Sequence, residues 1–512
     1  METENHKQVG QSESDDGDAK RTSLFQRLRR HAYRKFPAVF PDPDCQRRLA
    51  IWQRRDEEEN KKSSPPDDEL IQLHALSVAE IYTSSHVEKL LSGLKSLGWH
   101  QDESLGSGGD PVAWIRRNRE ASLGGGWLNL GGIQRAGLKR FIGPSRVAQL
   151  PEHVQYALGK VYGLTSSITC IVMTFVYEDD YALRFDVALR AERRTYTEPR
   201  RRGNQIVQPF FQKANEVRAI RREAENDAAE WFRGNLPGLF SSGVLEGQFP
   251  SYEFITLDKA VPFATEREEY LRALNVENDI GAWNSDELPG LRFAQPASRE
   301  DEGFHAILAI RKEQLEAQDL RSWGGSNRGA YVGYLEEHLH GLLSRWALLA
   351  VIAGFERTLN VVRDSALLSV RRNRNARKAM SKMSGLISAG IDIATIAADL
   401  RQVATKKAWF EGDLPKFSPS TPKYYAPEMS LARALREEIE KRAGKLQETD
   451  RSIRDLIIQH GTMLSATESM NLQNRVAILT WVLVILTIVI TVLTAVAAYE
   501  PLLGILGYSV PR

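Results

Sequence analysis

VAILTWVLVILTIVITVLTAVAA, residues 476–498, is a run of 23 residues without a charged side chain. An α-helix rises about 1.5 Å per residue, so this run would be about 34 Å long, enough to cross a hydrocarbon core of about 30 Å. A buried core helix is the alternative, but core helices rarely run this far without a polar face. The run therefore predicts a C-terminal transmembrane helix.

The segments around this helix bear on its topology. Fourteen residues follow it, 499–512, with Glu500-Pro501 expected to end the helix. We expect them to be too few and too polar to cross back, which predicts a single-pass, tail-anchored protein. Arg475 and Arg512 flank the span evenly, so basic residues do not decide its orientation. Residues 1–24 are polar and contain no apolar stretch typical of a secretory signal, which predicts an N-terminal domain in the cytoplasm.

The composition of the whole chain narrows the class of protein. At 512 residues we expect about three folded units of roughly 150 residues each. Hydrophobic residues make up 42% and charged residues 26%, which excludes a generally disordered or collagen-like chain. Lys and Arg number 68 against 66 Asp and Glu, a balance that argues against a nucleic-acid partner. Two cysteines, Cys45 and Cys170, cannot form a disulfide framework and suit a reducing compartment.

The N-terminal part is predicted to hold a tail, a basic segment and a linker. Residues 1–24 have the composition of a disordered tail. Residues 25–69 join a basic, aromatic-containing segment to a charged, proline-containing linker at 55–69. The basic segment can lie on an anionic membrane surface, although a short surface helix is the simpler interpretation. An α/β soluble domain is expected over 70–330, with an amphipathic helix at 86–97.

The clearest β pattern lies in the middle of this domain. SSITCIVMTFVY (166–177) and YALRFDVALRA (181–191) are separated by three acidic residues. β-branched and aromatic residues on both sides of a polar turn predict a hairpin, which we place in a small sheet covered by helices. A long helix over 211–232 and a weaker strand over 252–257 follow.

The C-terminal half is predicted to be helical. A helical region is expected over 331–426, in which the apolar run 346–355 is too short for a membrane and indicates a buried helix. Apolar residues spaced by three or four over 427–475 predict a coiled-coil-like stalk helix that continues into 476–498. The predicted fold class is α+β and mostly helical: a small mixed α/β cytoplasmic domain, a helical bundle, and a long stalk helix running into one transmembrane helix.

Local motifs do not predict an enzyme. The glycine-rich stretches 103–111 and 123–132 lack the spacing of phosphate-binding loops and indicate loops beside strands. His338 and His340 are two residues apart, which does not place both on one ligand site of a helix. We therefore expect no catalytic residue, metal ligand or cofactor, with an enzyme assembled only in the fold as the alternative.

Two groups of side chains are candidate binding residues. Arginines in the loop after the predicted hairpin can hold an anionic ligand or a lipid headgroup, with a solvated surface as the alternative. They are Arg193, Arg194, Arg200, Arg201 and Arg202. A second basic run lies within 371–382. Four threonines of the membrane helix fall within about 60° of one face and can form an interface between copies, unless each hydroxyl bonds back to its own helix. They are Thr480, Thr487, Thr491 and Thr494.

The order of these segments resembles the divalent-cation channel family typified by CorA, in layout only. That family carries a Gly-Met-Asn loop after its first membrane helix and then a second helix. Here AAYEP (497–501) stands where the loop should begin, so magnesium transport is not implied. We therefore expect a non-enzymatic scaffold or sensor that forms homo-oligomers through stalk and anchor in the lipid bilayer. The alternative is a membrane-perturbing or channel-forming effector gated by its cytoplasmic domain, in a stress or phage-defence setting.

Overall fold

The computed structural model describes residues 44–99, 109–120, 125–137, 145–200, 203–245, 249–264, 268–277, 280–295, 303–371, 393–421 and 429–505, with isolated positions elsewhere. The predicted tail at 1–24 and most of the second basic run therefore lie outside the described residues. So do the last seven residues, 506–512.

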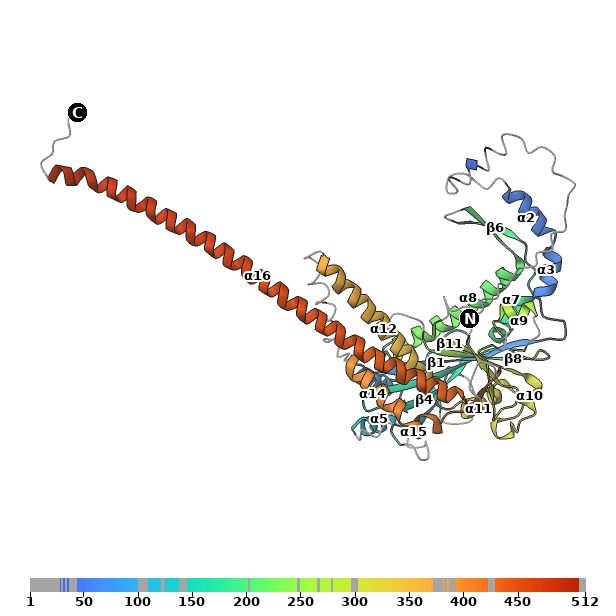
Figure 1. Ribbon diagram of the computed structural model, residues 1–512. Helices are drawn as coiled ribbons and strands as arrows, with labels where there is room; N and C mark the ends of the chain where they lie inside the picture. Colours follow the sequence, from blue (N-terminus) through green and yellow to red (C-terminus); the bar gives the residue numbers. More distant parts are fainter. Residues whose placement is uncertain are drawn as a thin grey trace.

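We call the folded part of the chain before the exposed end of α16 (Leu431–Ile505) the body. A ten-stranded sheet runs through it (Figure 1), in the order β12-β9-β10-β11-β8-β1-β5-β4-β2-β3. The β8–β11 and β2–β3 pairs are parallel, and the other pairs are antiparallel. The sheet is therefore large, and our prediction of a small sheet is wrong. The strands are β1 Ile71–Tyr82, β2 Gly126–Gln134, β3 Ser145–Val147, β4 Val154–Gly163, β5 Thr169–Tyr177, β8 Ser251–Leu257, β9 Trp283–Ser285, β10 Arg292–Ala294, β11 His305–Arg311 and β12 Phe417–Pro419.

The predicted hairpin is wrong in its second half. Its first half is β5, which is buried along its whole length between β1 and β4. The second half forms two helices instead, α6 (Asp179–Ala182) and α7 (Arg184–Arg190). Phe185, Ala188 and Leu189 of α7 are buried, and their spacing by three and four is the period of a helix face rather than of a strand.

Helices cover both faces of the sheet. On one face, Ser77 of β1 lies opposite Thr174 and Tyr252 on the neighbouring strands, and its hydroxyl bonds to Glu336 of α11 (Arg328–His338). On the other face, the adjacent residue of β1 lies opposite Phe175, whose ring contacts Trp231 of α8 (Pro209–Asn235). Since successive side chains of a strand point to opposite faces, α8 and α11 lie on opposite sides.

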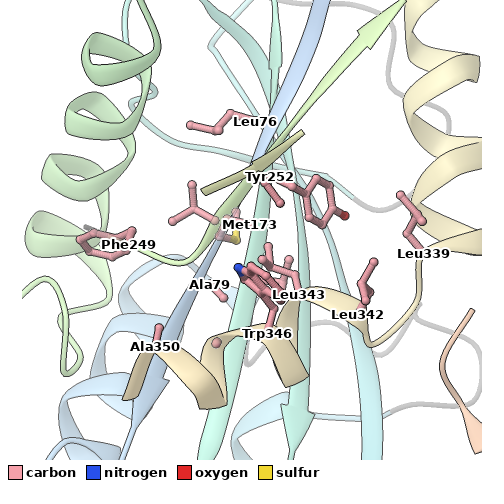
Figure 2. Close-up of a cluster of buried hydrophobic side chains, with 14 of the residues drawn as sticks. Leu76, Ala79, Met173, Phe249, Tyr252, Leu339, Leu342, Leu343, Trp346 and Ala350 are labelled. Carbon is pink, nitrogen blue, oxygen red and sulfur yellow. The ribbon is translucent and has the colours of Figure 1, made fainter. Parts of the chain in front are cut away.

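The α11 helix turns sharply into α12 (Leu342–Arg371), at an angle of 68°. The pair is apolar enough to be considered as one broken membrane span, but both helices are packed inside the body. Figure 2 shows Leu343 and Trp346 of α12 against the sheet, on the side of Ala79 of β1. The prediction of a buried helix over 346–355 is confirmed.

The longest element is α16, which runs from Leu431 to Ile505 as one helix of 75 residues. Its first turns pack against α12 and α14 (Ile393–Thr405), and the rest projects away from the body (Figure 1). The helix continues through Pro501, so the predicted stop at Glu500-Pro501 is wrong. The apolar stripe of its first half is buried against the same chain. Its buried members are Leu431, Leu435, Ile439, Ala443, Leu446 and Ile453.

The N-terminal linker that we predicted differs from the structure. Part of it forms α3 (Asp56–Ser63), which follows α2 (Cys45–Gln53) and packs against α8 and α9 (Glu269–Ala273). The predicted amphipathic helix is present as α4 (Val87–Ser96). The remaining elements are α5 Pro111–Glu120, α10 Lys312–Glu316, the short 3-10 helix η2 Arg321–Trp323, α15 Lys407–Gly412, β6 Tyr196–Arg200 and β7 Gly203–Val207.

Candidate functional site

One stretch of α16, Leu472–Ala497, is long and apolar enough to span a membrane, and none of it is buried inside the body. From Val476 to Val496 its large apolar side chains are 44–69% exposed. Soluble monomers rarely expose contiguous apolar patches larger than a few hundred Å². This part of the helix therefore requires an apolar environment outside its own chain.

The four threonines of this stretch all bond to their own helix. Each hydroxyl donates to the carbonyl oxygen four residues earlier, over 2.7 or 2.8 Å. The sequence left open whether these hydroxyls bond to their own helix or to another copy. Bonding to their own helix gives each hydroxyl proton an acceptor within a single helix. Each hydroxyl oxygen can still accept a hydrogen bond, and the small side chains still permit close approach of a second helix. An interface between copies at these threonines stays a prediction.

The predicted arginine loop is divided among several environments. The side chain of Arg193 pairs with Glu216 of α8, while Arg194 is exposed. Arg200 ends β6, which pairs with β7 as a separate two-stranded hairpin. Arg201 and Arg202 lie outside the described residues. The described part of this segment does not bring the arginines together on one phosphate-sized site.

A buried polar cluster centres on Glu336 of α11. Its carboxylate accepts hydrogen bonds from Thr174 Oγ1 (2.5 Å), Tyr252 OH (3.0 Å) and Ser77 Oγ (3.1 Å). Lys160 Nζ lies 3.2 Å from the other carboxylate oxygen. Burial alone would raise the pKa of Glu336, but Lys160 and the hydroxyl donors hold it below its usual value. The cluster is thus an ionised carboxylate held by four partners from four different strands, and it ties α11 to the sheet.

A second buried cluster has the geometry of a Ser–His–Glu triad. Ser251 Oγ lies 2.9 Å from His305 Nδ1, and His305 Nε2 lies 3.5 Å from Glu253 Oε2. Glu225 Oε1 lies 3.1 Å from His305 Nδ1, and Arg221 bonds to the Glu253 carboxylate over 2.6–2.9 Å.

The chemistry of this cluster does not suit a nucleophile. Burial opposes a charge on His305, but the carboxylates of Glu225 and Glu253 raise its pKa to about 9. A histidine that is protonated at neutral pH cannot accept the proton of a serine. Ser251 is also 0% exposed. The arrangement is therefore a closed set of two cations and two anions that joins α8, β8 and β11.

The two histidines at the α11–α12 corner have separate partners. His338 Nδ1 bonds to the carbonyl oxygen of Tyr334 over 2.7 Å. His340 packs on the exposed ring of Trp127, with its Nδ1 3.3 Å from Tyr162 OH. Burial, together with nearby positive charges, lowers the pKa of His340 to about 4. The two rings do not share a ligand.

Over the described residues, no group of three or more His, Cys, Asp and Glu side chains is arranged to hold a metal ion. A groove of about 470 Å³ lies between α14 and α16, lined by charges of both signs that include Arg401, Glu440 and Lys441. These alternating charges select no single class of ligand. No family model, no curated protein and no solved structure matches this chain.

Proposed function

We propose that this chain is a single-pass membrane protein with its body in the cytoplasm, acting as a non-enzymatic, oligomeric scaffold or sensor. The observation that supports this proposal is the continuity of α16. One unbroken helix contributes buried side chains to the body up to Ile453 and then provides the apolar stretch from Leu472. A shift of α12 or α14 would reach the bilayer through this helix, because the same rigid element belongs to both parts.

The cytoplasmic orientation is supported by the cysteines. Cys45 and Cys170 are both free and both buried. Unpaired cysteines are the rule in reducing compartments, whereas secreted domains tend to use theirs in disulfides. We therefore place the body on the cytoplasmic side of the membrane.

Self-association is proposed for the part of α16 beyond the body. The stripe up to Ile453 is already used within one chain, so it is not free to form a coiled coil with another copy. The next 18 residues, 454–471, would extend about 27 Å as a helix. Ile458 and Met470 in this connector are 64% and 63% exposed. The connector and the threonine face of the span are the remaining surfaces for assembly.

Replacing Thr480, Thr487, Thr491 and Thr494 together by Val tests this assembly. Val keeps the shape of Thr and raises hydrophobicity, so membrane insertion should be unchanged. If the face is an interface, each lost interhelical hydrogen bond removes about 0.6 kcal/mol, and crosslinked multimers in detergent should decrease severalfold. A matched control replaces Val482, Val489, Val492 and Val496, which lie away from the threonine face, by Thr. An unchanged crosslinking ladder would mean that the threonine face contacts only lipid.

The same threonine face supports a second candidate function, a membrane-perturbing or channel-forming effector. If several copies assemble with these hydroxyl oxygens inward, they would line a narrow polar path. Conductance or dye release from liposomes containing the full chain separates this function from a scaffold, which should leave the bilayer sealed.

We also propose that residues 193–202, which we call the arginine segment, bind phosphate groups of a lipid headgroup or another anionic ligand. Changing Arg200, Arg201 and Arg202 to Ala should weaken binding to anionic vesicles or polyphosphate at low salt by about tenfold, because phosphate contacts by Arg are charge-assisted. The difference should shrink as salt screens the charges. Changing Lys95 of α4 and Arg116 and Arg117 of α5, which are all exposed, to Ala removes the same charge elsewhere and serves as the control. If the triple variant and the parent bind equally at low salt, the arginine segment is only a solvated surface and does not bind phosphate.

A further inference from the structure

The acidic helix α3 lies directly against the arginine segment. Its sequence, DEEENKKS, contains no apolar side chain. The hydrophobic effect therefore contributes little to holding it, although it packs against α8 and α9. We call residues 56–64 the acidic strap.

Hydrogen bonds to the arginine segment hold the strap. The Asp56 carboxylate accepts from the amide of Thr195 (2.9 Å) and from its hydroxyl (2.5 Å). The Asn60 side chain donates to the carbonyl oxygen of Arg193 (2.7 Å) and accepts from its amide (2.9 Å). Ser64 Oγ donates to the carbonyl oxygen of Leu189 (3.1 Å). These groups would bond to water if the strap left, so each contact adds little net stability.

A lysine lies beneath the strap. Lys213 of α8 is 0% exposed, and its ammonium group donates to Asn60 O (3.2 Å) and Ser64 Oγ (2.8 Å), which both belong to the strap. Burial and the nearby charge of Arg193 lower the pKa of Lys213 to about 8. Glu192 is the nearby carboxylate that opposes this shift. The strap thus supplies two oxygen acceptors to this ammonium group, and phosphate oxygens are acceptors of the same kind.

We propose that the acidic strap is a releasable cover over a phosphate-binding site formed by Lys213 and the neighbouring Arg193. The inference rests on the proposed anion binding of the arginine segment and adds its regulation. The strap carries four carboxylates, at 56–59, and two lysines, at 61 and 62, a net charge of −2. When the strap leaves, the electrostatic potential around Lys213 becomes more positive, and the ammonium group loses its two hydrogen-bond acceptors. The carboxylates of Glu192 and Glu216 remain in place. Segments held by few apolar contacts open at low free-energy cost.

Three variants of the full chain, in phosphatidylcholine nanodiscs, test the cover. D56A/N60A removes four strap contacts and should open it. K213M should also open it, because Met cannot donate either hydrogen bond to the strap, but it lacks the charge that binds phosphate. E57A removes one negative charge from an exposed position of the same helix and should leave the strap closed. Trypsin cleavage at Lys61 and Lys62 reports opening, and the melting temperature reports whether the body is intact.

Binding is measured with two probes, inorganic tripolyphosphate and vesicles of phosphatidylcholine with 30 mol% phosphatidylglycerol. D56A/N60A should be cleaved faster and bind at least one probe about tenfold tighter than the parent, because the apparent Kd falls as the open fraction rises. K213M should be cleaved faster without any gain, and E57A should match the parent. A gain with tripolyphosphate alone identifies a soluble phosphate ligand, and a gain with vesicles alone identifies a lipid headgroup.

Three results would overturn the cover. If D56A/N60A opens but binds both probes as the parent does, no phosphate site lies beneath the strap. If trypsin cleaves D56A/N60A no faster than it cleaves the parent, these contacts do not hold the strap. If the parent and the opened variant bind neither probe, the anion-binding proposal itself fails and the cover fails with it. Binding that is lost only in R200A/R201A/R202A leaves the first proposal intact.

Discussion

Glu336→Leu should lower the free energy of unfolding of the body by about 3–5 kcal/mol, the cost of breaking a buried ion pair from one side. The change leaves the Lys160 ammonium group buried without its carboxylate, at a side-chain exposure of 12%. It also removes the acceptor of three hydroxyl groups, on Ser77, Thr174 and Tyr252. Chemical denaturation of the detergent-solubilised chain measures the loss.

The neighbouring residue provides the control. Glu337 lies on the same helix and is exposed, so Glu337→Leu should change stability by less than about 0.5 kcal/mol. A double variant, E336L/K160M, should recover part of the loss, because it removes the unpaired charge as well. If E336L is no less stable than E337L, the cluster does not hold α11 to the sheet.

The stability of the body should also fall as pH rises from about 6.5 to 9. The pKa of His305 is about 9 in the folded chain and about 6.5 in an unfolded chain. A raised pKa means that the folded state binds the proton more tightly, so this stabilisation is fully present below pH 6.5. It is lost as pH rises through about 9, and its size is on the order of 3 kcal/mol.

His305→Gln isolates this contribution. Gln has no titrating group, so the variant should be less stable than the parent at pH 6, with the difference shrinking towards pH 9.5. Other groups that titrate in this range are present in both proteins and cancel in the comparison. A parent-minus-variant difference that stays constant from pH 6 to 9.5 would show that His305 is not charged in the folded body.

The sequence predicted best those elements whose signal is local and long. The apolar stretch and the helix that carries it follow from an uninterrupted pattern, and α8 and α12 follow from helical periodicity. Most of the sheet was missed for a physical reason. β1 and β5 are buried on both faces, so they show none of the alternation that marks a half-exposed strand. The short β9, β10 and β12 carry too few residues to form a pattern.

The buried clusters could not be predicted from the sequence, because their members are distant along the chain. Glu336 meets residues from β1, β4, β5 and β8, and no spacing rule connects them. The strap was interpreted as a linker because its composition is charged and lacks apolar residues. Its contacts are hydrogen bonds to Thr195 and Arg193, more than 130 residues away, and composition carries no information about such partners.

The most direct test of the account is the membrane retention of the full chain compared with a chain ending at Asn474. The full chain should remain in the membrane pellet after an alkaline carbonate wash and ultracentrifugation, and should be released only by detergent. The shorter chain keeps the packed part of α16 and lacks nearly all of the exposed apolar stretch, so it should be soluble. Recovery of the full chain in the soluble fraction without detergent would contradict the account.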